Sequence, residues 1–112
     1  MESNLSTTKV RVAGLVNGVL DFVPPIIAPS LPINRSRVQG PDFTVTGTAT
    51  DENGIGLVEF RVGAGPWQAA EGTGSWSAAV AGVASGPVTI RFRATDAAGN
   101  QSATISRAYT VF

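Results

Sequence analysis

A chain of 112 residues is long enough to fold as one domain around its own hydrophobic core. Eight basic and eight acidic residues leave no net charge, which argues against nucleic acid and against a polybasic mode of membrane binding. Histidine and cysteine are absent, so disulfides, thiolate nucleophiles, imidazole bases and Cys/His zinc sites are excluded. We therefore expect a protein that is not an enzyme.

The first 23 residues are predicted to form an extension with a pattern of its own. Asn17-Gly18 favours a type I′ hairpin turn, and the flanking segments Lys9–Val16 and Val19–Val23 are apolar on both faces. Residues 1–23 are therefore expected to form an additional β-hairpin or to be the tail of a neighbouring domain.

No segment of the chain is expected to insert into a membrane. The most apolar stretch, residues 10–28, is interrupted by charged residues and by Pro24-Pro25, whereas a spanning helix needs about 18 continuous apolar residues. It also lacks the basic start and the cleavage site of a signal peptide, so an export signal would lie outside this chain. The prolines favour extended chain, and we place the start of the main domain, residues 24–112, at this point.

From residue 43 onward, apolar and polar residues alternate with a period of two, which is typical of strands with one buried and one solvated face. The segments with this pattern are Phe43–Thr50, Val58–Val62, Trp76–Val80 and Val88–Thr95, and Ala103–Phe112 is expected to be a closing strand. The inward-facing residues are expected to form a core that includes Val45, Val58, Phe60, Trp76, Ile90 and Phe92.

Turn-forming residues separate these segments at short intervals. Each interval contains Gly, Pro, Asn or Asp, which supply positive φ, fixed φ or side-chain bonds to the backbone. The predicted turns are Asp51–Gly54, Gly63–Pro66, Glu71–Gly74, Gly82–Pro87 and Asp96–Asn100. Short strands at regular spacing with such turns indicate an all-β sandwich or barrel.

Five segments resemble a known family in their order and spacing. They are Val45-Thr-Gly-Thr-Ala-Thr-Asp-Glu-Asn-Gly54, Val58-Glu-Phe-Arg-Val62, Gly65-Pro-Trp-Gln-Ala-Ala70, Gly72-Thr-Gly-Ser-Trp-Ser77 and Arg93-Ala-Thr-Asp-Ala-Ala-Gly-Asn100. Through them, residues 24–112 resemble the bacterial immunoglobulin-like repeats of large surface and secreted proteins. The resemblance implies an immunoglobulin-like β-sandwich of about seven antiparallel strands in two sheets, connected as a Greek key.

Repeats of this kind commonly form tandem arrays that act as stalks, spacers or ligand-binding tips of adhesins, biofilm proteins and multi-domain hydrolases. The resemblance therefore implies a structural module of a larger cell-surface or secreted protein, with neighbouring immunoglobulin-like domains as its partners. A module that binds carbohydrate or a host protein is one alternative, because one fold serves many functions. An accessory domain of a secreted enzyme is another, since Gly54–Arg61 and Trp67–Ala70 also resemble the small β domain of sulfite-oxidase-type enzymes.

Two acidic loops are candidates for a calcium site. In the implied topology, the loops 51–55 and 96–101 meet at one end of the sandwich. The candidate ligands are Asp51, Asn53, Asp96 and Asn100. Their oxygens suit Ca²⁺, which takes six to eight such ligands, although the spacing matches no dedicated calcium loop. The alternative is that these side chains cap their own turns, with Gly54 and Gly99 at positive φ.

The two tryptophans are expected to play different roles. Trp76 is in phase with Ala78 and Val80 and is therefore predicted to lie in the core. Trp67 follows Gly-Pro at an expected strand edge and is the candidate ligand-binding residue, where an indole stacks on a sugar ring. The alternative is that the Trp67 ring covers the sheet edge.

Three arginines, Arg61, Arg91 and Arg93, are expected to point outward from two strands that pair in this fold. Antiparallel pairing would place Glu59 opposite Arg91 or Arg93, where an exposed ion pair contributes at most about 1 kcal/mol. The arginines are interpreted as a solvated face, with a patch for an anionic ligand as the alternative.

Overall fold

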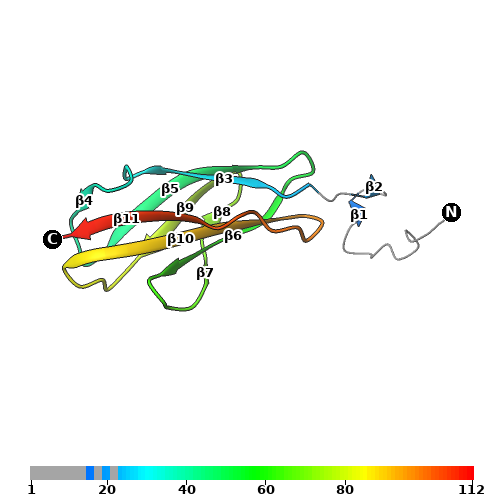
Figure 1. Ribbon diagram of the computed structural model, residues 1–112. Coiled ribbons are helices and arrows are strands. Elements are labelled where there is room, and N and C mark those ends of the chain that lie inside the picture. Colours follow the sequence, from blue (N-terminus) through cyan, green and yellow to red (C-terminus); the bar gives the residue numbers. More distant parts are fainter. Residues whose placement is uncertain (1–14, 17–18, 21–22) are drawn as a thin grey trace.

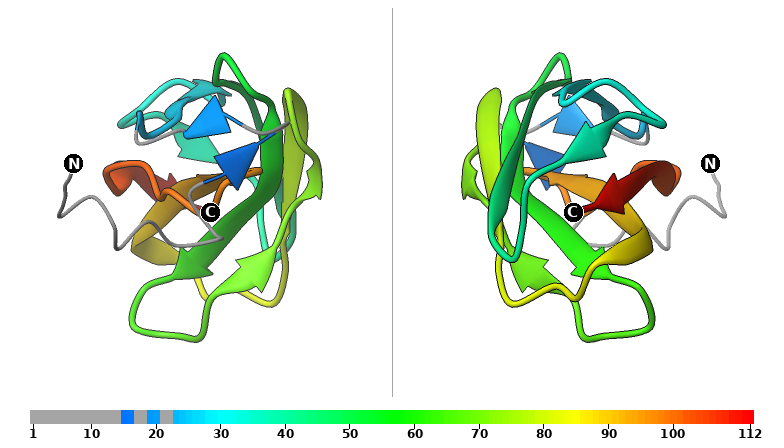
Figure 2. Two further views of the ribbon diagram at one scale, coloured as in Figure 1. Left: turned by 90° about the vertical axis from the view of Figure 1, so that its right-hand side faces the viewer. Right: turned by 90° about the vertical axis from the view of Figure 1, so that its left-hand side faces the viewer.

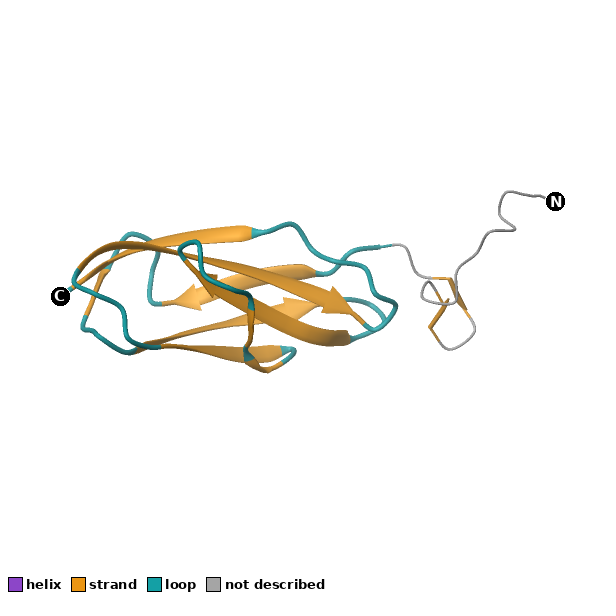
Figure 3. Ribbon diagram, turned by 90° about the horizontal axis from the view of Figure 1, so that it is seen from below, coloured by secondary structure: helices purple, strands orange, loops and turns teal. Residues whose placement is uncertain are grey.

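The computed structural model describes residues 15–16, 19–20 and 23–112, and all regular structure in them is β-strand (Figure 3). The strands are β1 (Leu15–Val16), β2 (Val19–Leu20), β3 (Ile26–Leu31), β4 (Arg37–Val38), β5 (Phe43–Thr50), β6 (Ile55–Val62), β7 (Gln68–Ala69), β8 (Glu71–Gly72), β9 (Ser75–Val80), β10 (Gly86–Asp96) and β11 (Ile105–Val111). Among these residues, no helix is long and apolar enough to cross a membrane.

The strands from β3 onward form two sheets that face each other (Figures 1 and 2). One sheet has five strands in the order β4-β11-β10-β6-β7, and the other has four in the order β3-β5-β9-β8. From β3 onward, the chain crosses from one sheet to the other after β3, β4, β5, β7 and β9. The predicted all-β fold of two stacked sheets is confirmed. The parallel pairing of β4 with β11 and the two-residue strands β4, β7 and β8 were not predicted.

The core lies between the two sheets and follows from the two-residue alternation. The six predicted core residues are all buried, with exposed fractions of 0–3% for Val45, Val58, Phe60, Trp76, Ile90 and Phe92. Trp76 of β9 and Phe92 of β10 meet across the interface with ring centroids 5.2 Å apart. Tyr109 of β11 is also buried and packs edge-on against Phe43 at 5.7 Å. Aromatic contacts between the layers therefore hold the two sheets together.

Gly47 provides the space that Trp76 requires. It lies on the inward face of β5 directly opposite Trp76 on β9. A Cβ atom at this position would be 2.5 Å from the Ala28 carbonyl oxygen and 2.5 Å from a ring carbon of Trp76. Because the first of these neighbours is backbone, it cannot move aside cheaply, and only glycine allows β3, β5 and the indole to approach this closely.

Replacing Gly47 by alanine is expected to lower the free energy of unfolding by about 1–3 kcal/mol, because the added methyl group overpacks the core. The control is Thr48→Ala, the next residue along β5, whose side chain is exposed; this change should alter stability by no more than about 0.5 kcal/mol. Urea denaturation of both variants makes the comparison. Equal effects would contradict the close approach at Gly47.

β1 and β2 pair antiparallel, with Val16 opposite Val19 and Leu15 opposite Leu20. The predicted turn residues Asn17 and Gly18, together with residues 1–14 and 21–22 of the N-terminal extension, lie outside the described residues. The division of the chain at residue 23 stays a prediction.

Candidate functional site

The loops that join β5 to β6 and β10 to β11 lie together at one end of the sandwich. Asp96 pairs with Ile55 at the end of the β10–β6 ladder, and the Ala97 N–H donates to the Gly54 carbonyl oxygen at 3.1 Å. β3 begins at this end as well, since Ile26 pairs with Thr50 at the end of β5. The structure therefore brings the two predicted calcium loops side by side.

The Asp96 carboxylate is bound within its own loop. Its side chain is 3% exposed, and Oδ1 accepts hydrogen bonds from the backbone N–H groups of Ala98 (2.9 Å) and Asn100 (2.8 Å). Oδ2 accepts a hydrogen bond from the Asn100 side-chain amide at 3.0 Å. Gly99, at a φ of 95°, allows the chain to fold back around this carboxylate. Asp96 and Asn100 therefore cap a turn.

Asp51 caps the facing loop in the same manner. Its Oδ2 accepts a hydrogen bond from the Asn53 backbone N–H at 3.0 Å, and Gly54 takes a φ of 95°. Oδ1 of Asp51 is shielded from solvent and has no hydrogen-bond partner among the described residues. In the described part of the chain, no three acidic, His or Cys side chains are grouped so that they could hold a metal ion. The geometry favours turn capping, and calcium binding stays a hypothesis.

A thermal melt of the chain decides between turn capping and calcium binding. We expect the same midpoint with millimolar Ca²⁺ and with EDTA, because the Asp96 oxygens already accept three hydrogen bonds from their own loop. A higher midpoint in Ca²⁺ that is lost in an Asp51→Asn variant would instead establish a calcium site at these loops.

Trp67 lies on the outer face of the five-stranded sheet, just before β7, and is half-buried. The guanidinium carbon of Arg93 is 4.0 Å from the centre of the indole ring, and that of Arg61 is 5.6 Å away. The indole thus covers part of the sheet and contacts two cations, which is favourable because the ring face carries negative charge density. Stacking of Trp67 on a sugar ring stays a prediction.

The register of β6 against β10 places charged residues opposite each other. Arg93 is opposite Glu59, one of the two predicted pairings, and its Nε is 2.9 Å from Glu59 Oε1. Arg61 is opposite Arg91, so two like charges face each other on neighbouring strands. Nη1 of Arg91 is 3.4 Å from the Gly63 carbonyl oxygen.

Sequence reasoning missed Arg35, which joins this face from the loop before β4. Its backbone N–H donates to the Ala108 carbonyl oxygen at 2.7 Å, and the Ala108 N–H donates to Asn34 Oδ1 at 2.8 Å. Arg35 has a φ of 70°, an uncommon conformation for a residue other than glycine. In the sequence, Asn34 indicates a turn at this position, because Asn is a turn-forming residue. Nothing in the sequence indicates that this turn packs against β11.

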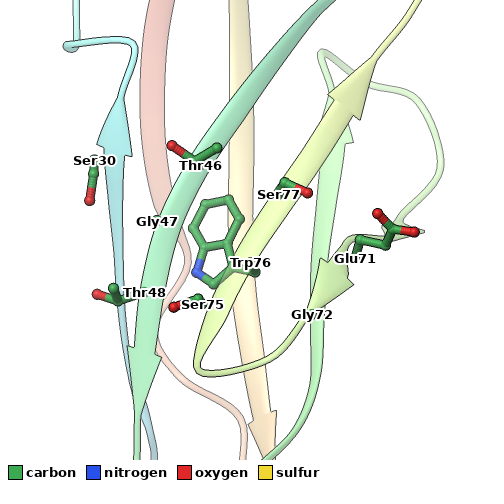
Figure 4. A pocket seen from close by; sticks show the side chains of 9 residues that line it. All are labelled: Ser30, Thr46, Gly47, Thr48, Glu71, Gly72, Ser75, Trp76 and Ser77. Atoms are coloured by element: carbon green, nitrogen blue, oxygen red, sulfur yellow. The ribbon is translucent and has the colours of Figure 1, made fainter.

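A shallow hollow of about 570 Å³ lies over the four-stranded sheet (Figure 4). Hydroxyl groups form most of its lining, from Ser30, Thr46, Thr48, Ser75 and Ser77. The ring of Trp76 lies between β5 and β9, and its Nε1 is shielded without a hydrogen-bond partner among the described residues. Glu71 is the one ionisable residue in the lining, so the hollow lacks the paired acid and base groups of hydrolytic sites.

The two sheets, with the first strand divided between them as β3 and β4, define an immunoglobulin-like β-sandwich. The chain belongs to the bacterial Ig domain family, whose profile matches residues 25–106. This confirms the resemblance seen in the sequence. Immunoglobulin-like modules are generally non-catalytic. No curated protein matches the chain in sequence.

Solved structures share the fold at low sequence identity. The endo-beta-1,4-mannanase of Thermotoga petrophila aligns with a TM-score of 0.65 and 14% identity, over 82% of this chain and 20% of that enzyme. The fibronectin(III)-like modules of Clostridium thermocellum CbhA align with a TM-score of 0.63 and 22% identity, over 81% of this chain and 48% of theirs. The SrpA adhesin of Streptococcus sanguinis aligns with a TM-score of 0.58 and 19% identity, over 82% of this chain and 59% of the adhesin chain. The chain thus spans less than two thirds of each of these proteins.

Proposed function

We propose that the chain is a non-catalytic spacer that presents or separates other domains in a larger bacterial cell-surface or secreted protein. The observation that carries this proposal is the position of the first and last strands of the sandwich along the chain: β3 enters it at one end, and β11 leaves it at the other (Figure 1). Neighbouring domains attached before β3 and after β11 would therefore lie at opposite ends. Such modules joined in series extend lengthwise, which is the geometry of a stalk.

The length of the strands sets the length that each module adds. β10 has 11 residues and therefore spans about 36 Å at roughly 3.3 Å per residue. The two ends of the sandwich are formed by loops, and we propose that these loops contact neighbouring immunoglobulin-like domains. Adhesion of the parent protein is part of this proposal, and the fold shared with an adhesin supports it without identifying a ligand.

The pairing of β4 with β11 would resist extension. Three backbone hydrogen bonds join the two segments. The Thr110 N–H donates to the Ser36 carbonyl oxygen at 3.1 Å, and the Phe112 N–H donates to the Val38 carbonyl oxygen at 3.0 Å. The Gly40 N–H donates to the Phe112 carbonyl oxygen at 2.9 Å. β4 and β11 run parallel and lie along the axis between the two ends. A force between the ends therefore loads these hydrogen bonds together, in shear, instead of opening them one after another.

Single-molecule pulling of the chain between flanking handle domains tests this mechanism. Thr110→Pro removes the N–H that donates to Ser36 and should lower the unfolding force, whereas Thr110→Ser keeps the N–H and should unfold at the parent force. Val45→Ala, a core change, controls for lost stability in general. An unfolding force for Thr110→Pro no lower than that of Val45→Ala would contradict the proposal that the β4–β11 pair resists the applied force.

A second candidate function is an accessory domain of a secreted enzyme. The mannanase similarity favours it, because the aligned domain forms a fifth of that enzyme's chain. Domain order in the parent gene separates the two proposals: tandem copies of this domain support the spacer, and a single copy beside a catalytic domain supports the accessory module.

A further inference from the structure

The zero net charge of the chain conceals an uneven distribution over the two sheets. The strands of the four-stranded sheet contain one charged residue, Glu71. All the arginines of the described residues belong to the five-stranded sheet or to the loop before β4; they are Arg35, Arg37, Arg61, Arg91, Arg93 and Arg107. On the outer face of this sheet, Glu59 is the acidic residue that its strands contribute. Arg107 is in register with the inward-facing Ile90 and does not belong to the outer face, but the other arginines make that face strongly positive.

Most of this positive charge is not neutralised within the described residues. Arg93 is paired with Glu59, but Arg61 and Arg91 lie directly opposite each other, an arrangement that destabilises a sheet. Nε of Arg61 is shielded from solvent and lacks a hydrogen-bond partner among the described residues. Both arginines are half-buried, where screening by water is reduced. An anion supplied from outside the domain would remove this repulsion.

A hollow on the same face provides a place for such an anion. It has a volume of about 450 Å³ and is lined by Asn34, Arg35, Thr89, Arg91, Ser106 and Ala108. The lining contains two guanidinium groups and two hydroxyl groups, and no acidic residue. The loop with Arg35 is fixed to β11 by the two backbone hydrogen bonds at Ala108, so the hollow is preformed.

The geometry points to an acidic polysaccharide as the ligand, with one of its carboxylates held between Arg35 and Arg91. Guanidinium groups bind carboxylates through paired hydrogen bonds, and the hydroxyls of Thr89 and Ser106 suit the hydroxyls of a sugar. Arg35, Arg91 and Arg61 lie beside or on three successive strands, about 4.8 Å apart, so they spread over roughly 10–15 Å. The three arginines are therefore spread over more than the width of one carboxylate group. A polymer that carries a carboxylate on successive units can contact all three.

Other polyanions fit the face less well. Nucleic acid binding is typical of domains with a pI above about 9, whereas this chain has a sequence pI of about 6.1. A protein partner would require an apolar centre in the interface, and the residues that line this hollow are mainly polar. The proposal goes beyond a spacer function, since a spacer needs no ligand on its outer sheet.

A calorimetric titration of the 112-residue chain with polygalacturonate at low salt tests the proposal. We expect binding that weakens as salt is added, and a loss of roughly tenfold in affinity for each of Arg91→Gln and Arg35→Gln, because each removes a charge-assisted contact. The matched control is Arg107→Gln, which removes the same charge from β11 at the position opposite the core residue Ile90. This control should bind as the parent does.

Four results would overturn the proposal: no binding, equal binding of neutral dextran, an equal loss in Arg107→Gln, and tighter binding of single-stranded DNA or polyphosphate than of polygalacturonate. Thermal melts accompany each variant. Arg35 is exposed in a loop, so Arg35→Gln should keep the parent midpoint and tests the site even if Arg91→Gln is destabilised.

Discussion

Replacing Phe92 by alanine is expected to lower the free energy of unfolding by about 3–5 kcal/mol. Phe92 is fully buried in the middle of β10, opposite Phe60 on β6, and its ring meets Trp76 of the other sheet at 5.2 Å. Removal of the ring takes away contacts to both sheets and leaves a cavity that rigid strands cannot close. Domains of this size are stable by only about 5–15 kcal/mol, so this loss is a large fraction of the total stability.

Equilibrium denaturation in urea measures this loss. Phe112→Ala is the matched control, because the Phe112 side chain is 55% exposed at the end of the chain; its replacement should change stability by about 0.5 kcal/mol or less. A loss below about 1 kcal/mol for Phe92→Ala would mean that the ring does not lie at the centre of the core.

Replacing Asp96 by alanine is expected to have the second-largest effect. The carboxylate is buried and accepts backbone hydrogen bonds from Ala98 and Asn100, so its removal leaves two N–H groups without their acceptor. A buried N–H left unsatisfied costs about 1–3 kcal/mol. Because the hydrogen bond of the Asn100 N–H is only partly buried, its loss costs less, and a total loss of about 2–4 kcal/mol is expected. Thermal and urea denaturation both report it.

Asp51→Ala is the control for Asp96→Ala, because Asp51 accepts one backbone hydrogen bond, from Asn53, in a more exposed loop. Its replacement should cost about 1 kcal/mol. If the two variants lost the same stability, the Asp96 carboxylate would not be the central acceptor of its loop.

The long strands could be predicted from the sequence because their alternation is fixed by burial. In β5 and β9, and in β10 from Ile90 onward, every second side chain faces the other sheet, and four of the six predicted core residues are buried there. The other two, Val58 and Phe60, are buried on β6. The strands β4, β7 and β8 could not be predicted, because each has only two residues and is too short to show an alternation of apolar and polar side chains. Tertiary contacts select their positions, as when β4 joins β11 in parallel.

The candidate site was predictable in position but not in detail. Loop residues Asp51 and Asp96 do come to one end of the sandwich, as the implied topology required. The sequence could not show that the Asp96 side chain folds back onto Ala98 and Asn100, because this depends on the local path of the chain. Arg35 reaches the outer sheet face only through the docking of its loop on β11, a contact 73 residues away along the chain (Arg35 to Ala108).

The contact between Trp76 and Phe92 tests the account most directly, because it exists only if β9 and β10 lie in two sheets that face each other. Nuclear Overhauser effects between ring protons of these residues measure it in solution on the full chain. The account predicts cross-peaks between the two rings, as expected for centroids 5.2 Å apart. Absence of these cross-peaks, with the Phe92 ring protons at the shifts of an unfolded chain, would contradict it.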